Sequence, residues 1–526
     1  MNRSLLLDQL NEDKTWDFII VGGGATGLGA AVDAASRGYS TILLEQSDLA
    51  KGTSSRSTKL VHGGVRYMAQ GDLALVREAC YERGLLLKNA PHLAKNQSFV
   101  IPNYTFFDNV LYTIGLKFYD MLAGKLSLGR SKFIGKKKTI EHLPTIRQKG
   151  LRGGVIYQDG QFDDARLAVN LAQTAIGKGA CILNYARVVS LQKQNGKICG
   201  VKVKDQETNI EYSVKGKVVI NATGVFVDDL LLMDKPEARK LVMPSQGIHL
   251  VMDRSFLDSE HALMIPKTSD GRVLFAVPWH DKLVVGTTDT VREHIELEPH
   301  ALEQEINFIL NTAANYLTRQ PTRADVLSVF AGLRPLAAPQ TEGKSTKEIS
   351  RNHKIIVSKS NLVTITGGKW TTFRRMAQDV VDRAIHQVHL AYKPCVTKTL
   401  KIHGYREQVN MQNHLYVYGS DIENVQQLTN EDAELKEKIS ATYDFTKAEV
   451  VWAVRKEFAR TVDDVLARRC RLLFLDAREA IKAAPVVAQI LAKELGRDDN
   501  WMHGQINDFT KLATGYILNG KLKIEN

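Results

Sequence analysis

The chain has 526 residues, enough for two or three domains with a large core, and a net charge of +12. Its hydrophobic content of 44% and charged content of 24% are ordinary for a folded globular protein and exclude a disordered chain. The five cysteines form no CxxC pair and no cluster with metal-ligand spacing, so neither structural disulfides nor a metal site is expected.

The excess of lysine and arginine is compatible with an anionic substrate, a lipid surface or RNA, although a solvated basic face explains it equally simply. No window has the length of an uncharged membrane span, and the apolar stretch near residue 5 is too short for a signal peptide. We therefore expect a protein of a reducing compartment, either cytosolic or peripheral to a membrane.

The first predicted unit is a strand, a glycine-rich turn, a helix and a second strand. The apolar, β-branched run Phe18–Val21 is typical of a buried parallel strand. The alanine-rich segment Ala25–Ser36 predicts a helix that ends before Gly38, and Thr41–Leu44 predicts the second buried strand. This order is that of a Rossmann-like α/β fold.

The turn between strand and helix carries the GxGxxG pattern. Gly22 permits the tight turn, Gly24 lets a diphosphate approach the backbone, and Gly27 lets the helix lie close on the strand. Glu45 ends the second strand, where a carboxylate holds ribose hydroxyls and favours FAD or NAD over NADP. The positions expected to turn N–H groups toward the phosphates are Ala25 and Thr26.

The polar loop QSDLAKGTSSRSTKLVHGGVRYM follows the second strand. Such a cluster of donors can reach a cofactor phosphate or ring, although each serine alone could equally belong to an exposed turn. His62 and Arg66 place an imidazole and a cation around a flexible glycine pair. The cofactor-binding candidates from this loop are Thr53, Ser54, Ser57, Thr58, His62 and Gly63.

Residues 73–93 predict a helix, 98–104 a strand, and 107–128 one or two amphipathic helices. A basic run at 130–138 follows. An apolar helix beside a basic run can lie on an anionic membrane, and a surface helix with a solvated loop is the alternative.

The next segments return to the dinucleotide fold. A helix at 163–180 precedes a short strand, and residues 187–193, 198–204 and 210–214 predict the strands of a β-ribbon. The apolar strand 218–220 then stops at small residues, which suits a second approach to the same cofactor. The expected contacts are Val188, Ala222, Thr223 and Gly224.

Residues 240–335 alternate with period 2 and predict an antiparallel sheet, interrupted by a helix at 301–319. Arg334 is expected in an immobile loop, and Arg351 at the start of a strand. Residues 362–385 predict a strand, a Gly-Gly-Lys turn and a helix whose N-terminus favours anions. The cofactor-binding candidates there are Gly368, Lys369, Trp370 and Thr371.

Six motifs in this order resemble one family. They are IVGGGATGLGAAVDAASRG, SRSTKLVHGGVRY, INATG, VVGTTDT, GLRPL and GGKWTTFRRMA. Their order and spacing are similar to those of the FAD-dependent glycerol-3-phosphate dehydrogenase family, within the flavoprotein amine and hydroxy-acid oxidases. Leu28 stands where that family usually has a small residue, and Phe373 where it usually has tyrosine. Neither change removes a charge that the chemistry needs.

The resemblance implies a mixed α/β fold with a Rossmann-like FAD-binding domain, an inserted antiparallel-sheet substrate domain and a C-terminal helical domain. The FAD-dependent region is expected over residues 1–395 and the helical domain over residues 396–526. The expected FAD-binding segments are about 16–95, 150–235 and 340–390. The expected substrate-domain segments are about 96–149 and 236–339.

The resemblance also implies oxidation of sn-glycerol 3-phosphate to dihydroxyacetone phosphate, with FAD taking the hydride and a membrane quinone taking the electrons. The resemblance further implies that members which use oxygen are longer chains with an insertion before the last domain. That insertion is not seen here, so a quinone rather than oxygen is expected as the electron acceptor. Such a protein would lie in the cytoplasm, attached peripherally to the inner face of the cell membrane. A homodimer is a further expectation.

A phosphate dianion requires several cations at fixed angles, which guanidinium groups supply best. The predicted substrate-binding residues are Arg66, Arg334, Arg351, His249 and Thr288. For the proton of the substrate hydroxyl, a histidine is the usual base, and His62 is the first candidate, ahead of His249. The predicted catalytic residues are His62, Arg334 and Lys369, the last as a further cation or as a partner of the reduced flavin.

Two other functions remain open at this point. An amine or amino-acid oxidase of the same fold would need one arginine for a carboxylate and an extended apolar pocket. An RNA-handling flavoprotein would explain the charge of +12, but the chain shows no RNA-binding motif with interleaved aromatics, so no nucleic acid is expected.

Overall fold

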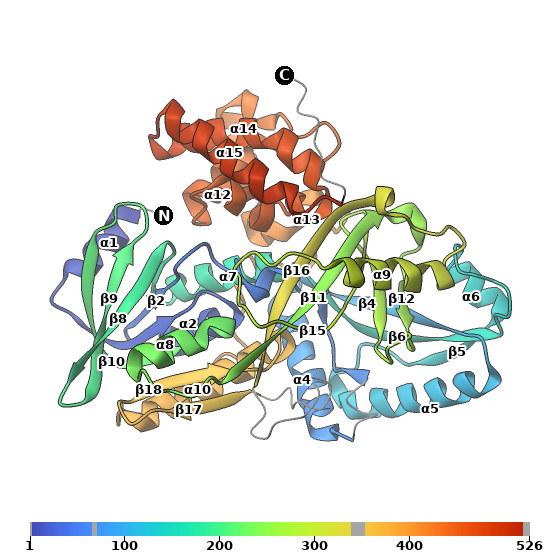
Figure 1. The fold of residues 1–526 in the computed structure, drawn as a ribbon, viewed down its shortest axis with the longest axis horizontal. Coiled ribbons are helices and arrows are strands. Elements are labelled where there is room, and N and C mark those ends of the chain that lie inside the picture. The colour runs from blue at the N-terminus through green and yellow to red at the C-terminus, as the bar shows by residue number, and fades with distance from the viewer. Residues whose placement is uncertain (1–2, 66–70, 338–352, 519–526) are drawn as a thin grey trace.

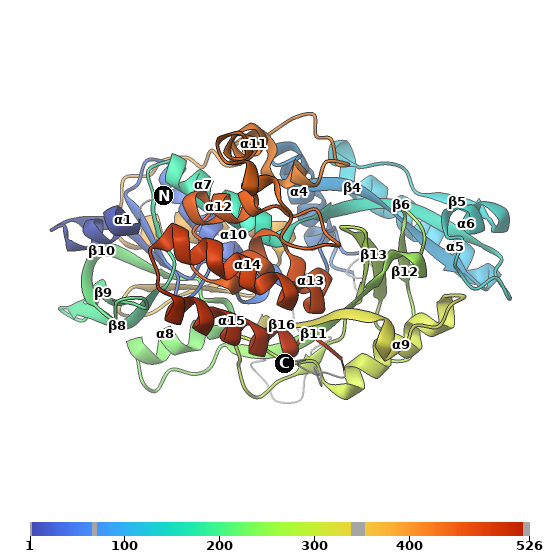
Figure 2. The ribbon, with the colours of Figure 1, turned by 90° about the horizontal axis from the view of Figure 1, so that it is seen from above.

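The computed structural model describes residues 3–65, 71–337 and 353–518. Two β-sheets lie next to each other, and a cluster of C-terminal helices sits above them (Figure 1). Seen from above, these helices cover the middle of the molecule (Figure 2). The mixed α/β fold with a C-terminal helical domain is thus confirmed.

The first sheet holds the dinucleotide fold. Its strands are ordered β17 (Lys354–Val357), β18 (Leu362–Thr366), β10 (Glu211–Asn221), β1 (Thr15–Val21), β2 (Thr41–Leu44) and β7 (Cys181–Leu183). From β18 to β7 every pairing is parallel, so the carboxyl ends of these strands share one edge. Ligands of open parallel sheets bind at that edge.

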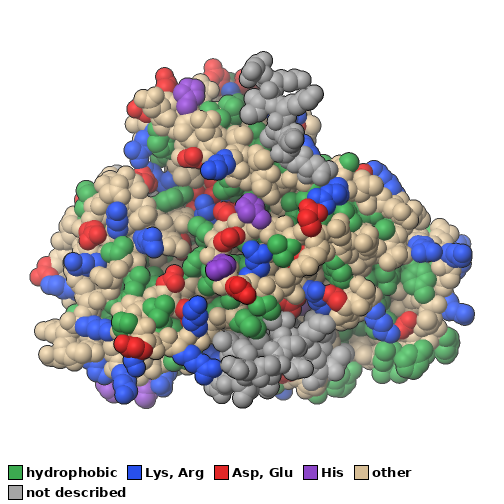
Figure 3. All heavy atoms as spheres, in the orientation of Figure 1, with side chains coloured by type: hydrophobic (Ala, Val, Ile, Leu, Met, Phe, Trp, Pro, Cys, Tyr) green, Lys and Arg blue, Asp and Glu red, His purple; other side chains and the backbone are tan. Residues whose placement is uncertain are grey.

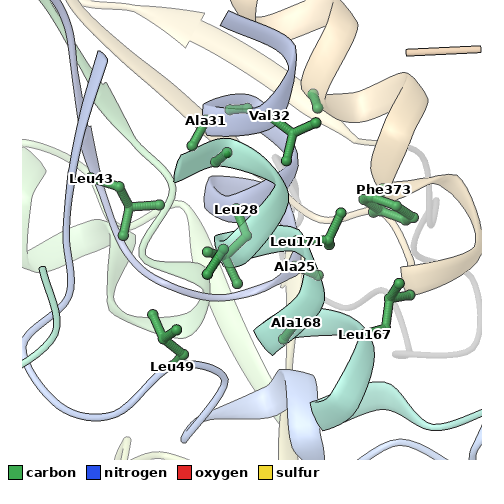
Figure 4. Packing of buried hydrophobic residues seen from close by; sticks show 14 of the residues in the cluster. Ala25, Leu28, Ala31, Val32, Leu43, Leu49, Leu167, Ala168, Leu171 and Phe373 are labelled. Carbon is green, nitrogen blue, oxygen red and sulfur yellow. The ribbon is translucent and has the colours of Figure 1, made fainter. Parts of the chain in front are cut away.

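The two faces of this sheet follow from the alternation of side chains along its strands. On one face, Phe18 and Ile20 join a core with α2 (Ala25–Ser36), α7 (Asp164–Gly177) and α10 (Phe373–Gln387). Figure 4 shows Leu28 of α2 among residues of both neighbouring helices. On the other face, Ile19 and Val21 pack with α8 (Val227–Asp234) and α1 (Arg3–Asn11).

The predicted β-ribbon consists of β8 (Ala186–Gln194) and β9 (Lys197–Asp205). The sequence suggested two separate strands at 210–214 and 218–220, but both belong to β10. The first half of β10 pairs with β9 in antiparallel fashion, and the second half pairs with β1 in parallel. One long strand therefore ties the ribbon to the dinucleotide fold.

The second sheet lies beyond the carboxyl edge of the first. Its order is β15 (Thr290–Val291), β11 (Val242–Asp253), β14 (Lys282–Gly286), β13 (Leu274–Trp279), β12 (Ala262–Ile265), β4 (Ala94–Asn103), β6 (Gly153–Phe162) and β3 (Leu60–Val61). β16 (Val326–Ala337) pairs with β11, and β5 (Lys132–Gly135) with β6. The predicted antiparallel pairing holds within residues 240–335. The expected boundary at residue 150 does not follow the sheets, because β6 belongs to the second sheet. β3, inside the expected FAD-binding segment 16–95, belongs to the second sheet as well.

Four further helices lie beside these sheets: α4 (Leu73–Asn89), α5 (Phe106–Ala123), α6 (Lys136–His142) and α9 (Glu303–Tyr316). In the described part of the chain, no helix combines the length and the apolar character that crossing a membrane requires.

The C-terminal domain comprises α11 (Ile422–Glu431), α12 (Lys447–Lys456), α13 (Leu472–Leu475), α14 (Ala477–Leu495) and α15 (Asp499–Thr514). Its core continues into the second sheet, where it includes Trp279 and Phe330. The domain is therefore packed directly onto the sheet, with α13 above β16 (Figures 1 and 2).

Candidate active site

Two adjoining cavities lie where the sheets meet. The turn cavity, of about 200 Å³, is lined by the glycine-rich turn after β1 and by the ends of β2 and β10. The sheet cavity, of about 300 Å³, lies over the second sheet. Both are lined by Thr53, Pro335 and residues 367–370, so together they form one continuous site.

The glycines of the turn cavity have the positions that their motif predicts. Gly22 has a φ of +112°, and a Cβ on it would lie 2.6 Å from the carbonyl oxygen of Ala222. A Cβ on Gly27 would lie 1.9 Å from the oxygen of Gly22, so Gly27 packs helix on strand and does not line the cavity. Gly24 is the N-cap of α2 and has no capping side chain. Of the two N–H groups expected to face an anion, that of Ala25 donates to Ser54 Oγ, whereas Thr26 lines the cavity at the helix N-terminus.

The predicted acidic residue reaches the same turn. The carboxylate of Glu45 accepts hydrogen bonds from the backbone N–H of Gly23 at 2.6 Å and of Ser47 at 2.9 Å. Burial raises the pKa of Glu45 above its ordinary value, and these two N–H groups oppose that shift. The remaining turn-cavity residues predicted from the sequence also line it: Ala25, Thr26, Ser54, Val188, Ala222, Thr223 and Gly224.

The loop after β2 bridges the two cavities. Ser54 Oγ accepts a hydrogen bond from the N–H of Ala25 at 2.9 Å, and its carbonyl accepts one from the indole of Trp370 at 2.8 Å. Thr53 donates to the carbonyl of Leu333 in β16 at 2.6 Å. The loop is therefore fixed to both sheets.

Glycines in the second sheet make room for its site side chains. A Cβ on Gly247 would lie 2.1 Å from a guanidinium nitrogen of Arg334, and one on Gly286 2.3 Å from the ring of His249. A Cβ on Gly332 would lie 2.8 Å from Cβ of Arg56. Gly247 and Gly332 are register partners, as are His249 and Gly286, so strand pairing opens the floor of the sheet cavity.

Arg334 lies in strand β16 opposite Ser245, and the prediction of a loop there was wrong. The GLRPL motif has the glycine and proline of a turn, but the long pairing with β11 keeps it extended. The guanidinium donates to Thr287 Oγ1 and to the carbonyl of Thr288, each at 3.0 Å. A more distant ion pair joins it to Asp289 at 3.5 Å. Arg334 is thus held over the cavity by its strand and its neighbours.

Thr288 does not present a free hydroxyl. Its Oγ1 donates to Glu305 at 2.7 Å and accepts from the N–H of Ile248 at 3.0 Å. Since its carbonyl also accepts from Arg334, this predicted substrate-binding residue holds that arginine in place.

His249 lies on the cavity floor and is only 2% exposed. Its Nε2 lies 2.8 Å from Thr58 Oγ1, and its ring stacks on Phe330 at 4.8 Å between centroids. Burial, together with the charges of Lys59 and Arg334, holds the pKa of His249 well below the ordinary histidine value. The imidazole is therefore neutral at physiological pH.

His62, Thr371 and Lys369 come together at the junction of the cavities. The backbone N–H of His62 donates to Thr371 Oγ1 at 3.2 Å, and both residues line the sheet cavity. Gly368 and Lys369 line both cavities. The predicted catalytic residues His62, Arg334 and Lys369 thus share one cavity.

Other predicted residues are placed differently. The N–H of Gly63 donates to the hydroxyl of Tyr119 at 2.8 Å, and Gly63 does not line either cavity. The hydroxyl of Ser57 donates to Asp164 at 2.7 Å, so it faces the protein interior although Ser57 borders the sheet cavity. Arg66 and Arg351 lie outside the described residues.

Two cations of the sheet cavity were missed by the sequence reasoning. Arg56 donates to the carbonyl of Ala331 at 2.9 Å and pairs with Glu298. Arg272 pairs with Asp270 in the turn before β13. The Ser-Asp-Gly-Arg turn was the only local signal for Arg272, and a charge in a surface turn is not distinctive.

The arrangement defines a class of protein. A glycine-rich βαβ turn of the kind that binds a diphosphate, next to a cavity with several cations, is typical of a dinucleotide-dependent oxidoreductase. Residues 17–383 match the family described as FAD dependent oxidoreductase, and residues 358–501 match the C-terminal domain of alpha-glycerophosphate oxidase. The helix N-terminus beside the cavity, Glu45 and the missing side chain at Gly24 fit the FAD that this family carries.

The particular family follows from closer relatives. The probable mitochondrial glycerol-3-phosphate dehydrogenase of Caenorhabditis elegans is 40% identical over 94% of this chain and 72% of its own. The mitochondrial glycerol-3-phosphate dehydrogenase SDP6 of Arabidopsis thaliana is also 40% identical, over 91% of this chain and 82% of its own. The chain belongs to the FAD-dependent glycerol-3-phosphate dehydrogenase family.

A solved structure agrees with this assignment. The glycerol-3-phosphate dehydrogenase of Bacillus halodurans, complexed with FAD, is 28% identical and superposes with a TM-score of 0.81. The similarity covers 98% of each chain, so it includes both sheets and the C-terminal domain.

Proposed function

We propose that this protein oxidises sn-glycerol 3-phosphate to dihydroxyacetone phosphate and passes the electrons to a membrane quinone. The observation that carries the proposal is Arg334, a guanidinium fixed over the sheet cavity beside the segment that lines both cavities. The relatives described above carry this substrate in their names.

The phosphate is bound by the cations of the sheet cavity. Arg334 and Arg272 offer forked donors, and Lys369 adds a point charge where the cavities meet. Asp159 and Asp289 also line the cavity, so the site is not uniformly positive. An amino-acid oxidase needs only one arginine for a carboxylate, and several cations around one cavity favour a phosphate ester.

Oxidation removes a hydride from C2 and a proton from the hydroxyl on the same carbon. FAD, when bound, supplies the acceptor for the hydride. His62 lines the cavity beside Lys369 and takes the proton as general base. His249 stays neutral because its pKa is depressed, so it orients a substrate hydroxyl rather than pairing with the phosphate.

The apolar part of the sheet cavity keeps water from the reacting carbon. Its wall includes Phe99, Tyr157, Met264 and Phe275. The first three belong to a core cluster that also contains Leu116 of α5, and Phe275 packs against that cluster. A dry wall strengthens the interaction between the cations and the substrate phosphate.

The decisive experiment mixes the purified yellow protein with glycerol 3-phosphate without oxygen. We expect the flavin absorbance to bleach, and to recover when a short-chain quinone is added. Glycerol serves as the control, since it has the same hydroxyl groups but no phosphate. A flavin that stays oxidised with glycerol 3-phosphate contradicts the proposed substrate. Recovery with oxygen that is as fast as with quinone contradicts the proposed acceptor.

His62→Ala tests the base. We expect kcat to fall by about 100-fold with little change in KM, since general-base catalysis contributes at least that much. Unchanged flavin absorbance in the variant serves as the control for cofactor binding. An unchanged kcat would mean that a group other than His62 is the general base.

Helix α5 supports the membrane part of the proposal. It exposes Phe106 at 73%, Phe107 at 70%, and Ile114 and Met121 at 65% each. Figure 3 shows apolar side chains gathered at the lower right, where Figure 1 places α5. The basic run at 130–138 follows in the chain. An apolar face beside basic residues suits an anionic bilayer on the inner side of the cell membrane.

Binding to lipid vesicles tests this face. The double variant Phe106→Ser and Phe107→Ser should lose flotation with vesicles that contain anionic lipid. The matched control is Ile210→Ser with Val396→Ser, two exposed apolar residues elsewhere, at 52% and 45% exposure. An equal loss of flotation in both double variants would mean that α5 does not form the membrane contact.

A further inference from the structure

Behind the floor of the sheet cavity, side chains from two distant parts of the chain converge on one buried carboxylate. It belongs to Asp164, the first residue of α7. One oxygen accepts from the N–H and hydroxyl of Ser57, at 3.1 and 2.7 Å, and from the ammonium of Lys59 at 2.8 Å. The other accepts from the guanidinium of Arg471, in the C-terminal domain, at 2.8 Å. The carboxylate therefore joins the cofactor loop to that domain.

The loop residues held by Asp164 flank a residue of the site. Between Ser57 and Lys59 lies Thr58, whose hydroxyl contacts the imidazole of His249 at 2.8 Å. Lys59 has a φ of +63°, and its ammonium also donates to the carbonyl of Ser55 at 2.7 Å. The backbone on both sides of Thr58 is thus fixed by contacts that lie outside the cavity.

A second route runs through aromatic rings. Phe474 of α13 meets Phe330 edge-on, with 4.9 Å between the ring centroids and 72° between the planes. Phe330 in turn stacks on His249. The ammonium of Lys59 lies 5.1 Å from the ring of Phe330 and 5.3 Å from that of Phe474. The C-terminal domain therefore supports both members of the Thr58–His249 pair.

Arg471 is built into this position. Its side chain is buried, its φ is +66°, and it contacts the rings of Phe474 and Trp279 at 4.6 and 5.3 Å. It donates to the carbonyl of Ser55 at 3.0 Å as well as to Asp164. In the described part of the chain, neither cavity has a lining residue from the C-terminal domain. Its effect on the site is therefore indirect.

We propose that Arg471 and Phe474 are positioning residues, through which the C-terminal domain fixes Thr58 and His249 on the cavity floor. The domain then governs how the substrate hydroxyl is held without touching the substrate. The inference rests on the proposed function, because its clearest readout is turnover of glycerol 3-phosphate.

The test compares this contact with another buried contact between the same two parts. Arg166 of α7 forms a bidentate pair with Glu457 at 2.6 and 2.7 Å, both residues are buried, and neither lines a cavity. Arg471→Lys keeps the charge but loses the fork, and Glu457→Gln removes the charge of the control pair while keeping the size of the side chain. Phe474→Leu tests the aromatic route without changing a charge.

For each purified holoenzyme we would measure Tm, kcat and KM for glycerol 3-phosphate, and the rate at which the flavin absorbance bleaches after rapid anaerobic mixing with glycerol 3-phosphate. We expect Arg471→Lys and Phe474→Leu to lower kcat by about tenfold and to alter the rate of bleaching, while Glu457→Gln lowers only Tm. If Arg471→Lys does not fold, Phe474→Leu alone decides.

Equal kinetics in all three variants, or equal losses in all three, would overturn the inference. The inference and the proposed function fail in different ways. If the wild-type flavin does not bleach with glycerol 3-phosphate, the proposed function fails. If it bleaches and Glu457→Gln matches the other variants, only the positioning role fails.

Discussion

The turn cavity and the sheet cavity bind their ligands by different means. The turn cavity presents backbone groups, since Gly24 carries no side chain and Glu45 is itself held by backbone N–H groups. The sheet cavity presents side chains, and neighbouring strands must leave space for them at Gly247 and Gly286. A local segment builds the glycine-rich turn and helix N-terminus of the first cavity, whereas the second cavity depends on strand register.

The turn cavity should lose its FAD completely when a side chain covers the backbone of the glycine-rich turn. Gly24→Val would place a branched side chain beside Ser54 Oγ, which lies 3.1 Å from the Cβ position, and in the path of the diphosphate. We expect a folded protein that purifies almost colourless, measured by the ratio of flavin to protein absorbance. Gly177→Ala, with no atom within 4 Å of its Cβ, is the control and should stay yellow. A yellow Gly24→Val protein would contradict this account of the turn.

A change in the sheet cavity should weaken substrate binding while the protein keeps its FAD. Arg334→Ala removes the guanidinium held by Thr287 and Thr288, and charge-assisted hydrogen bonds are worth about 1.5–3 kcal/mol each. We expect kcat/KM for glycerol 3-phosphate to fall by about 1000-fold, mostly through KM, with normal flavin absorbance. Arg254→Ala, a half-exposed arginine whose partners Glu260 and Asp281 are exposed, is the control. Normal kinetics would remove Arg334 from the site.

These differences explain what could be predicted from the sequence. The bounds of α2 and β2 were predicted correctly, because the βαβ signal is continuous in the chain. Gly22, Gly24 and Glu45 line the turn cavity for the same reason. Arg334 was assigned to a loop because its strand is recognised only by its pairing with β11. Arg56 and Arg272 were missed because only the tertiary fold brings them to the cavity.

A smaller change in the sheet cavity should distinguish the effect of the space around Arg334 from the effect of its charge. Gly247→Ala keeps every charged group but places a methyl group 2.1 Å from the present position of the Arg334 guanidinium. The guanidinium must shift, and we expect KM to rise by about tenfold while kcat changes little. Gly135→Ala, where a Cβ meets nothing within 4 Å, should behave as wild type. A KM equal to that of wild type would mean that register does not position Arg334.

The smallest expected effect is on stability and concerns the neutral His249. Its folded-state pKa lies well below the unfolded value of about 6.5, so below that pH the unfolded chain binds a proton that the folded protein does not. The unfolding free energy therefore falls with decreasing pH, by about 1.4 kcal/mol per pH unit for this one group. His249→Asn should remove that slope, seen as a smaller difference between denaturant unfolding at pH 7 and at pH 5.

His92 provides the comparison for this prediction. Burial also lowers its pKa, to about 3, but His92 does not line the sheet cavity. His92→Asn should therefore reduce the pH dependence of stability without changing KM. His249→Asn should change both, because its ring belongs to the cavity floor. If both variants alter stability and neither changes KM, His249 is part of the core and not of the substrate site.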